Sequence, residues 1–539
     1  MKPPADLRGI TFHHPSAFWL GTVAVTLGVL LHLPMYLGAR DTGYRMAGMA
    51  VDGPMKAGMA LILVGLVATS YGLLPSLSRG RPAVAALRVK ALDDARLSRA
   101  HVALVLVMSA AVTIDVMKPV TLSFVVPGMG REYGLRSPLN PQGDVPISLL
   151  PLAGITGTVL GSILWGWMGD RIGRRASILL AGVIFVATSI CGSMPDYRWN
   201  FFMCFVMGLG VGGMLPITFA LLAETIPARH RGWLMVLVGG DVAGAYVIVS
   251  WLAAELTPTY SWRILWLLGL PTGVLLLLLN RWIPESPRFL IQNGREDEAR
   301  AVMERYGATL VEEGERSELD VEKDVRSSWA QLFRKPFLGL SAVVGLFGLG
   351  VGLVTFGFQL WIPSNLQKLG FSEVTSASIL RDSALLGLPA TFVIAWLYGF
   401  WSSKKTMILL SLVTAASLGG FVVLGDRVVD NRTRLDLLLI LPITGISSIL
   451  AVLIAYASET FPTRVRSRGT GLAAGASKLG GVAIIALVVA GTTPPSIART
   501  ALIGAIPLAL GAVAMAFAGV ETRRRQLEDI TAEELSRAG

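Results

Sequence analysis

The chain alternates from one end to the other between long apolar runs and short polar connections. The apolar runs are about twenty residues long, enough to cross the hydrocarbon core of a bilayer as an α-helix. They fall at about 17–37, 55–74, 101–124, 147–168, 176–194, 201–222, 233–255, 263–279, 336–361, 374–400, 406–424, 435–457, 469–489 and 497–518. The pattern predicts an all-α polytopic membrane protein with about 14 transmembrane helices.

Composition supports this class. Of the 539 residues, 53% are hydrophobic and 15% charged, whereas a soluble protein carries roughly 25% charged residues. The net charge of +11 lies mostly in short loops beside the spans, so we predict membrane topology and no nucleic-acid binding. Cys191 and Cys204 lie in apolar runs and are expected to be core residues. His13, His14 and His32 are too scattered for a metal site, and we expect no metal or other cofactor.

The basic residues also predict the orientation. Segment 78–100 carries six Lys and Arg residues, so we expect it in the cytoplasm. Loop 40–52 then lies outside and the N-terminus inside, with the first span kept as an anchor. The charged tail 521–539 is expected to be cytoplasmic too. We therefore predict a multi-pass protein of the cell membrane with both termini in the cytoplasm.

The last twelve runs form two sets of six that repeat one another. Residues 169–180 align with 399–410, and ETIPARHR at 224–231 aligns with ETFPTRVR at 459–466. Such halves enclose a binding site near the bilayer midplane and rock about it. We expect five parts: a two-helix N-terminal extension with its cytoplasmic connector (1–99), an N-terminal bundle (100–283), a cytoplasmic linker (284–335), a C-terminal bundle (336–520) and a tail (521–539).

The turn GWMGDRIGRR at 166–175 concentrates charge that cannot lie in hydrocarbon, and Gly173 permits a tight turn. It resembles the loop between helices 2 and 3 of the major facilitator superfamily of secondary transporters. PESPRFL at 284–290 and FPT at 461–463 resemble the sugar-porter, organic-ion and synaptic-vesicle-protein branch. The resemblance implies the major facilitator fold of two six-helix bundles, here with two extra N-terminal transmembrane helices.

In that family, charged groups at these motifs form a cytoplasmic network that latches one access state. The resemblance assigns this gate network to Asp170, Arg171, Arg174, Glu224, Arg229, Arg231, Glu285, Arg288, Glu459, Arg464 and Arg466. The alternative is that these groups only solvate the ends of loops. Two departures matter: Phe400 stands where the second copy would repeat Asp170, and Cys204 replaces an arginine common in helix 4.

Ionisable groups within the spans are the candidates for solute and proton binding, because charge in hydrocarbon normally faces a cavity or a partner. Asp115 and Lys118 lie one turn apart and can pair on one helix face. The remaining candidates are Asp241, Gln359 and Lys478. The alternative is that each only fixes helix packing. For Arg381 and Asp382, near the outer surface, we favour a structural or gating role.

The leading interpretation is a secondary transporter that moves a small polar solute by alternating access. The chain has no Gly-Lys phosphate loop, so coupling must come from a gradient, and Asp115 or Asp241 makes protons the favoured ion. Protonation of Asp115 would free Lys118 for an anionic solute, which Lys478 would also contact. A neutral sugar is the alternative solute.

The alternative function is a non-transporting receptor or scaffold, with protein partners or self-association through the two extra helices. Metalloprotease and nucleophile-elbow motifs are missing, so we predict that the protein is not an enzyme.

Overall fold

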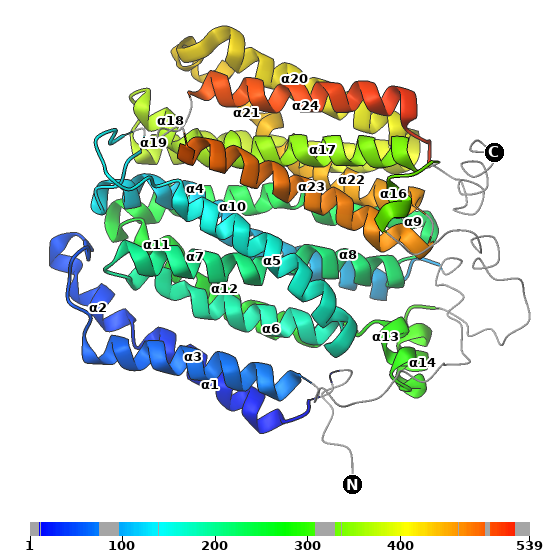
Figure 1. Ribbon diagram of the computed structural model, residues 1–539, viewed down its shortest axis with the longest axis horizontal. Helices are drawn as coiled ribbons and strands as arrows, with labels where there is room; N and C mark the ends of the chain where they lie inside the picture. The colour runs from blue at the N-terminus through cyan, green and yellow to red at the C-terminus, as the bar shows by residue number, and fades with distance from the viewer. Residues whose placement is uncertain are drawn as a thin grey trace, which may run out of the picture. The chain divides into compact units, whose positions relative to one another are not determined.

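The computed structural model describes residues 10, 12–74, 96–137, 139–307, 329–335, 337–461, 463–490 and 496–522, and these form a helical protein (Figure 1). In this described part, 13 helices are long and apolar enough to cross a membrane. The chain divides into two compact units. Unit 1 comprises residues 1–228 with 251–313, and unit 2 comprises 229–250 with 314–539, so the division passes within one helix.

Unit 1 contains the first bundle and two short helices that follow it. The bundle helices are α4 (Arg99–Glu132), α5 (Leu149–Ile172), α6 (Arg174–Ala187) with η3 (Thr188–Ser193), α7 (Tyr197–Val211), α8 (Met214–Thr225), the second half of α10 (Val242–Tyr260), α11 (Arg263–Leu267), and α12 (Gly269–Leu279) with η4 (Asn280–Trp282). The two short helices are α13 (Pro287–Gln292) and α14 (Glu296–Arg305).

The predicted run 201–222 is divided into α7 and α8 at Gly212 and Gly213. Neither piece alone is long enough to count as a span, which explains the difference between about 14 predicted helices and the 13 found. The glycines around this break serve helix packing. A Cβ on Gly208 would overlap the Gly154 carbonyl of α5, and a Cβ on Gly161 would overlap Leu209 of α7. Small residues therefore let the two backbones touch.

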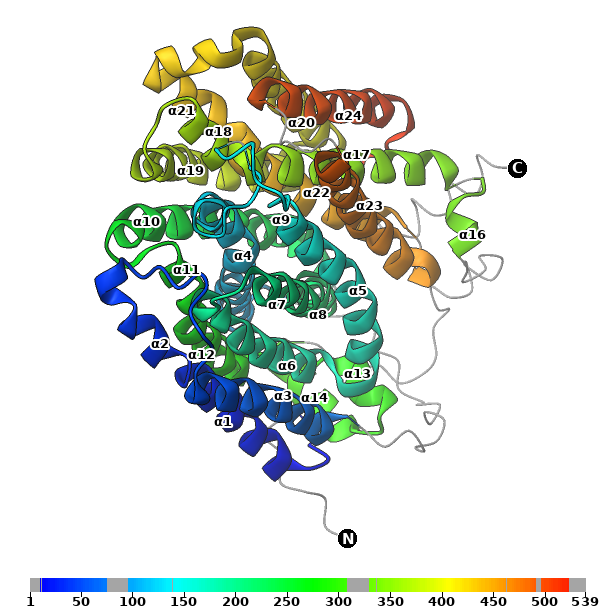
Figure 2. The same cartoon turned by 60° about the vertical axis from the view of Figure 1, so that its left-hand side comes forward.

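The N-terminal extension is an antiparallel hairpin that lies along α6 (Figures 1 and 2). Its elements are α1 (Pro15–Leu30), α2 (Leu33–Gly38), η1 (Arg40–Thr42) and α3 (Gly53–Leu73). Glycines seven residues apart allow α1 and α3 to approach closely: a Cβ on Gly21 would lie 2.7 Å from the Gly65 carbonyl, and one on Gly28 would lie 2.7 Å from the Gly58 carbonyl. We call residues 12–74 the N-terminal hairpin.

Unit 2 contains the second bundle. Its elements are α9 (Ala228–Gly240), whose first residue falls in unit 1, the first half of α10, α16 (Trp329–Leu332), α17 (Leu338–Gly357), η5 (Gln359–Trp361), α18 (Ile362–Lys368), α19 (Glu373–Trp396), η6 (Leu397–Trp401), α20 (Ser403–Leu424), η7 (Gly425–Asp430), α21 (Arg432–Ile440), η8 (Leu441–Gly445), α22 (Ile446–Thr460), α23 (Thr463–Ala490) and α24 (Ile497–Ala518). The π-helical turn η6 ends the helix that α19 begins, and the π-helical turn η8 lies between α21 and α22. Such turns often mark functional positions, because they leave helix carbonyls open to other partners.

Candidate functional site

A buried carboxylate organises the end of unit 1 where the α5–α6 turn lies, which we call the Gly173 end. Glu285 is only 2% exposed. It accepts the backbone N–H of Arg174 at 2.7 Å, of Arg175 at 3.2 Å and of Ser286 at 2.9 Å. The first two N–H groups open α6, where the helix dipole favours a negative charge. Burial nevertheless dominates and raises the pKa of Glu285 to about 7, although the three N–H groups and the Arg174 charge oppose the shift.

Glycine is required at the turn for two reasons. Gly173 has φ of +96°, which side-chain-bearing residues rarely adopt. A Cβ at this position would also overlap the Glu285 carboxylate and touch Phe289. The carboxylate can therefore reach the start of α6 only because Gly173 leaves the space.

The same carboxylate is linked to Glu224 at the end of α8. The Ser286 hydroxyl donates to Glu224, and Nη2 of Arg174 lies 3.8 Å from the Glu224 carboxylate. Nη1 of Arg174 donates to the Gly169 carbonyl at 2.5 Å. The α5–α6 turn, the end of α8 and the segment after α12 are thus joined by one polar network, which contains Arg174, Glu224 and Glu285 of the predicted set.

Unit 2 contains a second network of the same design. Glu521 accepts the Ser403 N–H at 3.0 Å and its hydroxyl at 2.7 Å, and so caps the start of α20. The Thr522 hydroxyl donates to Glu459 at 2.7 Å, and the Tyr398 hydroxyl donates to the same carboxylate at 2.7 Å. The two networks are therefore equivalent: in each, a glutamate caps the start of a helix and the next residue donates its hydroxyl to a second glutamate, in Glu285–Ser286 and in Glu521–Thr522. Glu521 and Thr522 were not predicted, although a glutamate followed by a hydroxyl residue after each sixth helix is a repeat that the sequence contains.

The other predicted network residues have different placements. Arg171 is exposed and lies over the Trp167 ring, 4.4 Å from its centre. Arg229 is also exposed, whereas Arg231 is half-buried and close enough to Glu459 for its charge to act there. The side chains outside the described part of the protein are those of Asp170, Arg288, Arg464 and Arg466.

The two hydrogen bonds of the Lys118 ammonium go to residues of another helix. Its ammonium donates to the Phe185 carbonyl at 2.9 Å and to the Thr188 hydroxyl at 2.8 Å. It also lies 4.6 Å from the centre of the Phe185 ring. Lys118 thus bonds to the α6–η3 junction, whereas its sequence position suggested a pair with Asp115. Asp115 is buried on the same helix, and the side-chain directions of helical residues explain the difference, because pairing depends on rotamer as well as spacing.

Three further candidates lie in unit 2. Asp241 stands at the break between α9 and α10 and is half-buried. Lys478 is half-buried within α23. Gln359 is buried in η5, and its Nε2 donates to the carbonyls of Pro442 and of Ile443, the latter at 3.2 Å. Both carbonyls belong to the π turn η8, so Gln359 ties two irregular segments together.

Arg381 and Asp382 form part of an ion-pair cluster between α19 and α21. Nη2 of Arg381 lies 2.8 Å from the Asp382 carboxylate, and Nη2 of Arg432 lies 3.1 Å from it. Arg432 also pairs with Asp436 at 2.9 Å. These contacts link two helices of one unit, and the predicted structural or gating role of Arg381 and Asp382 stays a prediction.

Comparison with known proteins identifies the class. The chain belongs to the major facilitator superfamily: the family described as "Sugar (and other) transporter" matches residues 128–533, and "MFS/sugar transport protein" matches residues 16–231. The resemblance inferred from the turn at 166–175 and the PESPRFL motif is confirmed. The protein is a multi-pass membrane transporter and not an enzyme.

Individual relatives agree with this family. The chain is 26% identical over 400 residues to the niacin transporter NiaP of Acinetobacter baylyi, covering 73% of this chain and 88% of that protein. It is 24% identical over 406 residues to the 4-hydroxybenzoate transporter PcaK of the same organism, covering 72% and 85%. The fold is similar to the proton:xylose symporter XylE of E. coli, with a TM-score of 0.65 and 18% identity over 80% of this chain and 99% of that one.

Proposed function

We propose that the protein is a proton-coupled secondary transporter of a small organic anion that works by alternating access. The observation that carries this proposal is the duplicated network built on Glu285–Ser286–Glu224 and on Glu521–Thr522–Glu459. Each copy ties the start of the third helix of a half to the end of its fourth. A transporter that alternates between two states needs such an arrangement, which can be made in one state and broken in the other.

The gate network is proposed to comprise the residues that the sequence assigned, extended by Glu521 and Thr522. Its effect on transport would be a shift in the populations of the access states rather than a change in solute contacts. A difference of about 1–3 kcal/mol changes such an equilibrium by about 5- to 150-fold. Substitutions in the network should therefore change the transport rate strongly while the affinity for solute changes less.

The anionic solute is supported by the relatives and by two lysines in the spans. Niacin and 4-hydroxybenzoate, named in the two relatives, are both aromatic carboxylic acids. Lys478 is the first candidate for the solute carboxylate, assisted by Gln359. The Lys118 ammonium has three N–H donors and two oxygen partners, so its third donor is proposed as a second contact for the solute. Asp115 and Asp241 are the proposed proton acceptors.

Uptake into proteoliposomes tests this function. The purified protein is reconstituted with an alkaline interior, and radiolabelled nicotinate, 4-hydroxybenzoate and glucose are offered in parallel. Accumulation of either acid that collapses when an uncoupler removes the pH gradient is the expected result. Accumulation of glucose alone would favour the neutral-sugar alternative. Binding of an acid without any flux would favour a receptor or scaffold.

A further inference from the structure

The opposite end of unit 1, which we call the Glu132 end, contains a buried arginine whose every donor is used. Arg263 opens α11 and is 0% exposed. Its Nε and Nη2 donate to the Glu132 carboxylate at 3.3 and 2.6 Å, and Nη2 also donates to the Tyr133 hydroxyl at 3.0 Å. Its Nη1 donates to the carbonyls of Gly192 and Met194 at 3.2 and 2.8 Å. A guanidinium has five N–H donors, so this side chain is completely satisfied.

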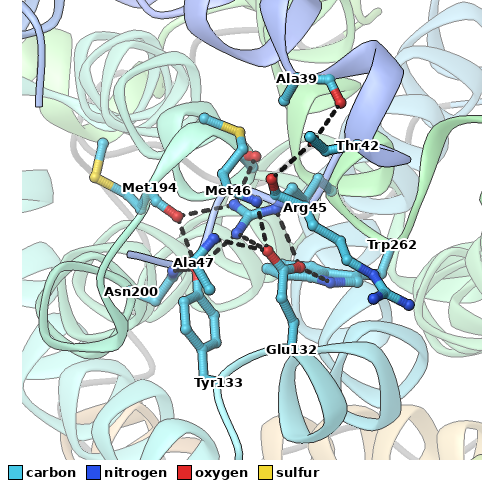
Figure 3. A network of polar contacts seen from close by, with 12 residues as sticks. Ala39, Thr42, Arg45, Met46, Ala47, Glu132, Tyr133, Met194, Asn200 and Trp262 are labelled. Atoms are coloured by element: carbon cyan, nitrogen blue, oxygen red, sulfur yellow. Dashed lines mark hydrogen bonds and ion pairs between the residues drawn. The ribbon is translucent and has the colours of Figure 1, made fainter. Parts of the chain in front are cut away.

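The Glu132 carboxylate is the centre of this network, and part of it comes from the N-terminal hairpin (Figure 3). The backbone N–H groups of Met46 and Ala47 donate to its Oε1 at 2.8 and 3.1 Å. The indole N–H of Trp262 donates to Oε2 at 2.8 Å. The hairpin thus supplies two of the hydrogen bonds that keep a buried charge stable.

Tyr133 connects the network to two more helices. Burial is the largest influence on the Tyr133 hydroxyl and raises the pKa of Tyr133 to about 12, so the hydroxyl keeps its proton. It donates to the Met194 carbonyl at 2.7 Å and accepts from Nδ2 of Asn200 at 3.0 Å. The ends of α4, η3, α7 and α11 therefore meet at one point, together with the segment that joins α2 to α3.

The hairpin is docked at this end by further contacts. The Tyr36 hydroxyl donates to the Tyr260 carbonyl at 2.7 Å, and the Gly48 N–H donates to the Pro195 carbonyl at 3.2 Å. Tyr44 stacks on Tyr36 with ring centres 4.7 Å apart. Tyr44 also has φ of +59°, a conformation that persists in such a residue only where its surroundings hold it.

The helix that ends at Glu132, α4, lacks two of its internal backbone hydrogen bonds. Prolines 119 and 127 lie inside α4 and have no N–H, so the carbonyls of Asp115 and Ser123 lose their helical partner four residues on. Interruptions of this kind let a helix bend. Contacts outside the helix must then hold the part of α4 that follows Pro119.

We propose that the N-terminal hairpin is a permanently docked brace, which holds the part of α4 beyond Pro119 in place through Glu132. This assigns the two extra helices an intramolecular partner, the Glu132 end of their own bundle, instead of another protein or a second copy of the chain. Bending of α4 is then confined to the neighbourhood of Asp115 and Pro119. The brace does not depend on which solute is transported, and its test needs no transport.

Amide hydrogen exchange of the purified full chain measures whether the hairpin holds α4. Tyr36→Phe removes one docking hydrogen bond, and Ala47→Pro removes one donor to Glu132. Each hydrogen bond has a net value of about 1 kcal/mol, so amides at 120–132 should exchange about fivefold faster, while those at 100–112 keep their rate. Tyr71→Phe is the matched control, because Tyr71 is exposed on α3 and stacks on His14 within the hairpin. Unchanged exchange at 120–132 in both docking variants overturns the proposal.

Cleavage of the full chain tests the permanence of the docking. A protease site is inserted between residues 80 and 90, the protein is purified in detergent through a C-terminal tag, and the chain is then cut. The cut hairpin should stay bound to the wild-type bundle and be released more readily from the Ala47→Pro variant. This variant leaves the Arg263–Glu132 pair intact, unlike Glu132→Gln, which would leave a buried arginine without its charge partner. Loss of the hairpin from a folded wild-type bundle, or exchange of cut hairpins between differently tagged copies, would contradict a permanent brace.

Discussion

Glu285 and Glu521 occupy equivalent places in the two halves of the chain. Glu285 caps the start of α6 through the N–H groups of Arg174 and Arg175, and Glu521 caps the start of α20 through Ser403. The residue that follows each carboxylate donates its hydroxyl to the glutamate that ends the fourth helix of the same half. The internal repeat therefore extends beyond the bundles, to the segments that follow their sixth helices.

The first prediction is a pH dependence that Glu285 controls. Its folded-state pKa of about 7 lies above the ordinary value of 4.5, so the folded protein binds the proton more tightly than the unfolded chain does. The unfolding free energy should fall as pH rises from about 4.5 to 7 and level off above 7, with a total change of about 3 kcal/mol. Thermal unfolding between pH 4.5 and 8 measures it. Glu285→Gln should flatten this profile.

The control for this experiment is Glu296→Gln, the same substitution at an exposed position at the start of α14. It should leave the profile of the wild type unchanged. A Glu285→Gln protein whose melting temperature follows pH as the wild type does would show that another group is responsible.

The second prediction concerns the space that Gly173 leaves for Glu285. Gly173→Ala forces a side chain into a positive-φ position and against the carboxylate. Gly294→Ala is the matched control, because Gly294 has φ of +70° and open space around its Cβ position. Both substitutions should cost about 1–2 kcal/mol for the backbone, and Gly173→Ala should cost more because of the overlap. Equal losses of melting temperature would show that Glu285 does not occupy this space.

The third prediction is that the two hydroxyl links have the same effect on transport. Ser286→Ala and Thr522→Val each leave a glutamate without one donor, at a cost of about 1–3 kcal/mol for a buried group. Each should slow uptake of the solute identified in proteoliposomes and change its half-saturation concentration less. Ser378→Ala removes a hydroxyl that bonds within its own helix and should have no effect. Normal rates in the Ser286→Ala and Thr522→Val proteins would remove these links from the gate.

The fourth prediction separates coupling from binding. Asp115→Asn should lower pH-gradient-driven accumulation by about tenfold or more while exchange of internal for external solute continues, because the proton acceptor is lost but the solute site remains. Lys478→Ala should weaken solute binding in both assays. If Asp115→Asn still accumulates solute and the gradient is still required, Asp241 becomes the proton acceptor to test.

The fifth prediction is the orientation in the membrane. Thr42→Cys lies in an exposed part of the hairpin, and both natural cysteines, Cys191 and Cys204, are buried. A membrane-impermeant maleimide added to intact cells should label Thr42→Cys and should not label Glu296→Cys. The reverse pattern would invert the predicted topology.

Sequence alone determined the architecture. Apolar run length depends only on the bilayer, so the spans were predictable, including the two extra ones at 17–37 and 55–74. The alignment of 169–180 with 399–410 was sufficient for two homologous halves. Arg174, Glu224 and Glu285 could be selected from the sequence because their motifs are local and resemble those of a known family, and their role in a gate stays a prediction.

The tertiary structure decided which of these groups meet. Lys118 bonds to Phe185 and Thr188, 67 and 70 residues away, although its spacing from Asp115 suggested a pair. Arg263 reaches Glu132 across 131 residues. Periodicity places a side chain along its helix, whereas its partner depends on how distant helices pack and on the rotamer that the packing allows.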